Sequence, residues 1–327
     1  MEKQDHLQHR KVIKATDKLI IQTNVPQAPF QYVNLDQIIP EPVPTPTPWT
    51  LPSFIQYNET KKTLWNYGKG DNSTNTSYGE DALIDPLTGY YNTAFGKEAL
   101  NSGQNSANTA IGCFSLNVLT TGTSNTALGA FSLISNESGS NNIAVGSNSL
   151  ASNTTGSQNI AVGPCLGLNV SGVNNIGIGS YALGANTTGN SNTGIGIDTL
   201  RSNTTGFSNI GLGPNAGYAN TTGFFNVYIG TDAAQNVVSG LRNISIGVDS
   251  MIGSTTGSSN IVLGTSATNA NNTACIVLGA GATATADYQF VVGSVGTPAG
   301  LVTTEVNASS KVWNVIINGV ARKILLA

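Results

Sequence analysis

The segment from Asn142 to Gln158 reads NIAVGSNSLASNTTGSQ, and the chain begins again at Asn159 with NIAVG. The same unit, Asn-x-x-apolar-Gly, starts at positions 75, 92, 108, 125, 142, 159, 175, 192, 209, 226, 243 and 260, in steps of 16 or 17 residues. Two degenerate copies follow, CIVLG from Cys275 and QFVVG from Gln289. Such a period without helical spacing is typical of a parallel β-solenoid, in which each coil pairs with the next. The sequence therefore predicts an all-β solenoid of about 14 coils with a period of about 17 residues.

The apolar side chains of one unit predict a repeated core. Ile143 and Val145 are two residues apart, so they point to the same side of a short strand, while Ala144 points to the other side. A second apolar position follows at Leu150, on an expected second strand. We predict that Ile143, Val145 and Leu150 fill the inside of the coil, and that Ile160 and Val162 do so in the next unit.

Glycines and asparagines recur at the expected corners of each coil. Gly146, Gly156, Gly163 and Gly179 are the predicted turn glycines, because glycine supplies the positive φ that a tight turn can require. Asn142 and its equivalents are expected to stack into a column, where their amides bond turn backbone or one another.

A single roll of this kind has little core. One coil buries about three large apolar side chains at roughly 1.5–3 kcal/mol each, whereas ordering each of its residues costs roughly 1–2 kcal/mol. The small residues Ala144, Ala161 and Gly177 on the other strand face suggest a closely packed neighbouring chain. We predict a homotrimer, with a monomeric solenoid as the alternative.

Composition and charge argue against several classes of function. Charged residues make up 9% of the chain, against about 25% in ordinary domains, and the net charge of −3 gives no footprint for nucleic acid. No apolar run of 18 residues is present, so no membrane insertion is expected. The N-terminal sequence lacks the apolar region of a secretory signal, which predicts assembly in a cytoplasm.

The sequence offers no catalytic constellation, so we expect no enzyme activity, no cofactor and no metal. The two histidines, His6 and His9, lie far from the repeats, and the three cysteines imply no disulfide framework. Acidic residues at Glu80, Asp81 and Asp85 could hold a cation, but spaced acids near a turn are more often simply solvated.

The repeats resemble those of a known group. The stretch NTALGAFSLISNESGSNNIAVGSNSLASNTTGSQNIAVG, from Asn125 on, resembles the head repeats of trimeric autotransporter adhesins and, more closely, the repeats of phage and large-virus fibre proteins. The resemblance covers about residues 75–293 and implies a trimeric left-handed β-roll. The ending KVWNVIINGVARKILLA resembles short C-terminal strands of viral structural proteins, and neither a secretion signal nor a membrane-barrel anchor is recognisable. The resemblance therefore favours a virion fibre over a bacterial adhesin.

The two ends differ from the repeats and give the expected domain organisation. Residues 1–55 are predicted to be an extended, proline-rich anchoring tail, 56–74 a junction, 75–293 the roll, and 294–327 a strand-rich cap or distal tip. Asn318-Gly319 is a hairpin signal within the last region. Apolar residues of the tail are candidate capsid anchors, with a flexible tail as the alternative: Phe30, Tyr32, Leu35, Ile38, Ile39 and Trp49.

Exposed aromatic residues are candidates for surface contacts. Phe224 and Phe225 replace the usual polar pair after a turn glycine, and Trp313 lies in the C-terminal region. They are expected either to contact a receptor or glycan or, for the Phe pair, to pack between neighbouring chains.

These features together predict a structural fibre or spike on a virion surface, assembled in the host cytoplasm. Its tail would contact a capsid or vertex protein, and its rod would aid attachment to a host receptor or glycan. The alternatives are a bacterial cell-surface adhesin or appendage subunit and, from the repeated Thr-Thr pairs, an ice-binding solenoid.

Overall fold

A computed structural model describes residues 74–84, 89–102 and 105–293 with their side chains, together with the backbone of six strands elsewhere. The chain divides into two units, Met1–Ser53 and Phe54–Ala327. In the first unit, β1 (Lys18–Ile21) pairs antiparallel with β2 (Gln31–Asn34).

Two further hairpins lie in the second unit. β3 (Gln56–Asn58) pairs antiparallel with β4 (Thr63–Trp65). β19 (Val312–Ile317) pairs antiparallel with β20 (Val320–Leu325), and Ile317 opposes Val320 across the intervening Asn318-Gly319. The hairpin predicted from Asn-Gly is therefore confirmed, since two-residue loops of this composition match the twist of the flanking strands.

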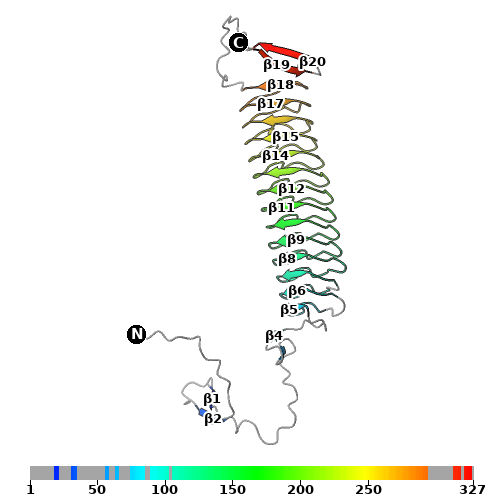
Figure 1. The fold of residues 1–327 in the computed structure, drawn as a ribbon, viewed down its shortest axis with the longest axis vertical. Coiled ribbons are helices and arrows are strands. Elements are labelled where there is room, and N and C mark those ends of the chain that lie inside the picture. Colours follow the sequence, from blue (N-terminus) through cyan, green and yellow to red (C-terminus); the bar gives the residue numbers. More distant parts are fainter. Residues whose placement is uncertain are drawn as a thin grey trace, which may run out of the picture. The chain divides into compact units, whose positions relative to one another are not determined.

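The repeats form one parallel sheet in which strands consecutive in the chain pair with each other (Figure 1). The register is constant: Ile143, Ala144 and Val145 lie beside Ile160, Ala161 and Val162. This confirms the predicted solenoid, with one three-residue strand for each of the fourteen units. The strands are β5 (Thr76–Tyr78), β6 (Thr93–Phe95), β7 (Thr109–Ile111), β8 (Thr126–Leu128), β9 (Ile143–Val145), β10 (Ile160–Val162), β11 (Ile176–Ile178), β12 (Thr193–Ile195), β13 (Ile210–Leu212), β14 (Val227–Ile229), β15 (Ile244–Ile246), β16 (Ile261–Leu263), β17 (Ile276–Leu278) and β18 (Phe290–Val292).

The second strand expected in each coil does not form. Leu150 instead lies in a turn segment with φ of +52°, and Asn148 before it has φ of +57°. The left-handed region is costly for residues other than glycine, yet it recurs in coil after coil, at Leu133, Leu183 and Leu200 among others. Repeated left-handed bends let a coil of about 17 residues return to its starting strand with only one straight side.

The orientation of the strand residues is opposite to the prediction. Ala144 is fully buried, while Ile143 beside it is 41% exposed and Val145 is only partly buried. In the next coil Val162 is exposed and Ile160 is partly buried. The predicted core is therefore wrong for Ile143, Val145, Ile160 and Val162, and correct for Leu150, which is fully buried.

The reason is the narrow interior of the roll. A Cβ atom added to Gly177 would lie 3.1 Å from Cγ of Leu166, and one added to Gly194 would lie 3.3 Å from Cγ of Leu183. In β6 to β13 the central strand residue is alanine or glycine, because the leucine column fills the space in front of it. These small residues make room for leucines of the same chain, not for a neighbouring chain as predicted.

The predicted asparagine ladder runs along the roll. The backbone N–H of Asn142 donates to Oδ1 of Asn125 at 3.0 Å, and Nδ2 of Asn142 donates to the carbonyl of Gly156 at 2.8 Å. A second ladder, which was not predicted, passes from Asn153 to Asn136, with Nδ2 and Oδ1 2.7 Å apart. Buried amides need such partners, because an unpaired buried polar group is costly.

The turn glycines fall into two groups. Gly146, Gly163 and Gly179 have φ between +100° and +126°, as expected for corner glycines. Gly156 does not lie in the left-handed region, and its role is spatial. A Cβ atom there would lie 2.3 Å from Oδ1 of Asn153 and 2.4 Å from the carbonyl oxygen of Gly172. Glycine at this position therefore leaves room for the second asparagine ladder.

Candidate functional site

The outward side of the main sheet is apolar along its length. We call it the apolar face and define it by the first and third residues of strands β5 to β18. The first position is threonine in β5 to β8 and mostly isoleucine afterwards, and the third is apolar throughout. Exposed members of the face are Tyr78, Phe95, Ile111, Leu128, Ile143, Val162, Ile178, Ile195, Ile210, Ile246, Ile276, Phe290 and Val292.

The size of this face makes it a candidate interaction surface. Adjacent strands are about 4.8 Å apart, so the face is roughly 60 Å long. Soluble monomers rarely expose a continuous apolar patch of more than a few hundred Å². Since every strand from β5 to β18 presents at least one large apolar side chain on this face, the face is suited to packing against another apolar surface.

A cluster of three phenylalanines lies on the turn edge of two successive coils. The rings of Phe207 and Phe224 stack with centroids 4.7 Å apart, and Phe225 meets both edge-on at 5.2 and 5.4 Å. Phe225 is 48% exposed. The structure thus brings the predicted Phe224 and Phe225 together with Phe207, which was not among the predicted contact residues. Its position directly after Gly206, as Phe224 follows Gly223, was the available signal.

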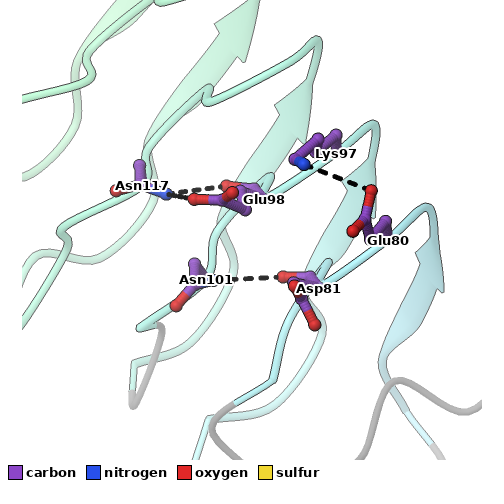
Figure 2. A network of polar contacts seen from close by, with 6 residues as sticks. All are labelled: Glu80, Asp81, Lys97, Glu98, Asn101 and Asn117. Atoms are coloured by element: carbon purple, nitrogen blue, oxygen red, sulfur yellow. Dashed lines mark hydrogen bonds and ion pairs between the residues drawn. The ribbon is translucent and has the colours of Figure 1, made fainter.

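The acidic residues near the start of the roll are held by neighbouring coils (Figure 2). Lys97 forms an ion pair with Glu80, with Nζ and Oε2 3.2 Å apart, and this hydrogen bond raises the pKa of Lys97. Nδ2 of Asn117 donates to the carbonyl of Glu98 at 3.1 Å. Both members of the ion pair are well exposed, and such pairs contribute little to stability. Asp85 lies outside the described residues, among which no group of three or more His, Cys, Asp or Glu side chains is placed to hold a metal ion.

The cysteines are free thiols. Cys165 and Cys275 are buried, and Cys113 is partly buried. Burial raises the pKa of Cys165 to about 12, since the thiolate would lose its hydration. Cys165 is therefore a protonated thiol at neutral pH, which suits a packing role and not that of a nucleophile.

Several predicted contact residues lie outside the part of the chain that the structure describes with side chains. Five of the anchor candidates, Phe30, Leu35, Ile38, Ile39 and Trp49, lie outside the described residues. Tyr32 belongs to β2 and Trp313 to β19, but their side chains are likewise outside the described part of the chain.

In the Thr-Thr pairs, the hydroxyl of the first threonine forms a hydrogen bond with the backbone of the next coil. Oγ1 of Thr187 donates to the carbonyl of Thr204, and Oγ1 of Thr204 to that of Thr221, both at 3.1 Å. These hydroxyls bridge adjacent coils, so they do not form the free, flat hydroxyl array that the ice-binding alternative requires.

Comparison with protein-family models and with curated proteins found no match to this chain. Within its described residues, no helix is long and apolar enough to cross a membrane.

Proposed function

We propose that this chain is a structural fibre or spike protein of a virus, which forms a homotrimer through its apolar face. The single observation that carries the proposal is that face: an ordered, hydrogen-bonded roll presents large apolar side chains outward on every coil, in addition to the leucines that fill its interior. Burying this area would supply the apolar contact that the narrow interior lacks.

Three copies suit the geometry of a roll with one flat side. Each chain has one apolar sheet face, and three such faces can pack around a common axis. A specific protein interface buries about 800 Å² on each partner, which a strip roughly 60 Å long readily provides. The expected mechanism is mechanical: the number of coils sets the length of the rod, and packing of the chains stiffens it.

The viral part of the proposal is supported by the resemblance of the repeats to those of phage and large-virus fibres. The N-terminal tail, with its anchor candidates from Phe30 to Trp49, would attach the rod to a capsid or vertex protein. The projecting rod would then aid attachment to a host receptor or glycan. A bacterial surface adhesin or appendage subunit is the alternative that uses the same roll.

The molar mass of the full chain in solution tests the association. Light scattering is expected to give three times the chain mass of 33.7 kDa. The double variant Ile178→Lys and Ile195→Lys places charges on the apolar face and should give a folded monomer. The matched control, Thr188→Lys and Thr205→Lys, adds the same charges at exposed turn positions of the same two coils and should stay trimeric. A wild-type chain that is monomeric at micromolar concentration would overturn the proposal.

The location of the chain separates the virion from the alternative. Mass spectrometry of purified virus particles and of bacterial envelopes from the same source should find the chain in the particles. Recovery from the envelopes alone would select the bacterial adhesin.

A further inference from the structure

A cavity of about 480 Å³ opens on the turn segments of four successive coils, away from the strand residues of the apolar face. Its lining includes Asn148, Gly167, Leu168, Tyr181, Gly184 and Arg201. Cavities that hold small organic ligands are about 300–1,000 Å³, so this one has the size of a binding site.

The cavity comes from a local break in the repeat. Three residues lie between Gly146 and Leu150, but only two lie between Gly163 and Leu166 in the following coil. The missing residue is the one that corresponds to Asn148 and Tyr181, so one exposed side chain is absent between them. The next lining position is also empty, since a Cβ atom added to Gly167 would meet no atom within 4 Å.

A fixed cationic group borders the cavity. Cζ of Arg201 lies 4.9 Å from the centre of the Tyr181 ring and 5.9 Å from that of Tyr218. Nη1 of Arg201 also donates to Oδ1 of Asp198 at 3.0 Å. A guanidinium has five N–H donors, so several stay available although two rings and one carboxylate hold its position.

We propose that this cavity binds a sugar ring of a surface glycan. A pyranose has an apolar face of C–H groups and a rim of hydroxyls. The half-exposed ring of Tyr181 and the exposed side chain of Leu168 suit the apolar face, and the guanidinium of Arg201 and the amide of Asn148 suit the hydroxyl rim. An acidic sugar would place its carboxylate against the same guanidinium.

Other occupants fit these residues less well. A nucleic acid needs a row of cations, whereas Arg201 is the one basic side chain lining the cavity and the whole chain has a net charge of −3. A folded protein partner needs about 800 Å² of contact. The cavity spans only four coils and offers one half-exposed aromatic ring, so it is small for such a partner.

The test is binding of full-length protein to an array of neutral and carboxylated oligosaccharides, followed by calorimetric titration with the best ligand of each class. The wild-type chain should bind members of at least one class. Tyr181→Asn removes the aromatic ring and places here the residue found at the equivalent position two coils earlier, Asn148. The backbone is left-handed at both positions, and Asn tolerates that conformation. This variant and Arg201→Ala should each weaken binding about tenfold or more.

Filling the cavity gives a second, independent variant. Gly167→Leu adds a side chain into open space and should abolish binding while the thermal transition is kept. The controls are Gly253→Leu, at another glycine with room for a Cβ atom, and Arg242→Ala, which removes an exposed arginine elsewhere. Both controls should bind as the wild type does.

The glycan site and the proposed trimer are tested by different measurements, because the trimer is tested by molar mass alone and the site by glycan binding. Absence of binding to every glycan, or binding that a folded Gly167→Leu chain retains in full, would overturn this site and leave the trimer untouched. Preference for carboxylated over neutral sugars, lost in Arg201→Ala, would assign the acidic class.

Discussion

At the scale of single residues, a large side chain in one coil is matched by a small residue in the coil before it. Tyr228 is fully buried at a strand position that holds alanine or glycine in β6 to β13. Gly217 stands at the leucine position of the preceding coil, and a Cβ atom there would lie 2.4 Å from Cδ2 of Tyr228. The tyrosine ring thus fills the space that a leucine fills in the preceding coils.

This exchange predicts a strong coupling between the two positions. Tyr228→Ala should destabilise the roll by about 3–5 kcal/mol through a cavity, and Gly217→Leu by about 1–3 kcal/mol through overpacking. The double variant should recover a large part of the loss, because its leucine occupies the vacated space. Urea unfolding of the four chains measures the coupling; losses that simply add would contradict it.

Tyr228→Phe is the matched control for the ring. The hydroxyl of Tyr228 is buried and makes no hydrogen bond of normal geometry. Burial raises the pKa of this phenol above its ordinary value, and the nearby side chain of Asn243 offsets only part of that rise. An unsatisfied buried polar group costs about 1–3 kcal/mol. The phenylalanine variant is therefore expected to be at least as stable as the wild type.

At the scale of the element, the sequence could predict whatever depends on spacing alone. The parallel order, the number of coils and the asparagine column all follow from the period at Asn142, Asn159 and Asn175. The period did not predict which side chains of the strand point into the roll. An Ile-Ala-Val strand has one face with large side chains and one with a small side chain, and the face with large side chains is ordinarily the buried one. Here Leu150 already fills the narrow interior, so the small face turns inward.

The same reasoning applies to the site residues. Phe224 and Phe225 were predicted because they break the repeat, and the structure adds Phe207 by stacking. The cavity beside Tyr181 was not predicted, since it comes from a residue that is missing between Gly163 and Leu166. An absent side chain leaves no motif, and only its surroundings in space reveal it.

The corner after each strand is predicted to tolerate glycine alone. Gly179 has φ of +121°, and a Cβ atom there would lie 2.7 Å from the carbonyl oxygen of Gly196 in the next coil. Gly179→Ala should therefore destabilise the roll by more than about 1 kcal/mol and lower the thermal transition. Gly167→Ala is the control, because its Cβ atom has open space and φ there is not left-handed; it should be neutral or slightly stabilising. Equal effects of the two substitutions would refute the steric explanation.

At the scale of the whole roll, each coil contacts chiefly the coils before and after it. β9 pairs only with β8 and β10, and the asparagine ladder passes from Asn125 to Asn142 to Asn159 in the same order. The stability of such a stack is approximately a sum of coil terms and nearest-neighbour terms. Length is then adjustable, provided that whole coils are added or removed.

Removal of one complete unit tests this modularity. Deletion of residues 125–141 takes out 17 residues and brings Ser124 directly before Asn142, so the backbone N–H of Asn142 can donate to Asn108 as that of Asn125 does now. This chain should fold, keep its β circular dichroism spectrum and the same number of chains in each oligomer, and form a rod about 4.8 Å shorter. Deletion of residues 125–132 removes only half a coil and places the ladder asparagines out of register, so every later coil must shift and the thermal transition should fall sharply. If the two deletions were equally damaging, the coils would not be independent units, and length could not be set by their number.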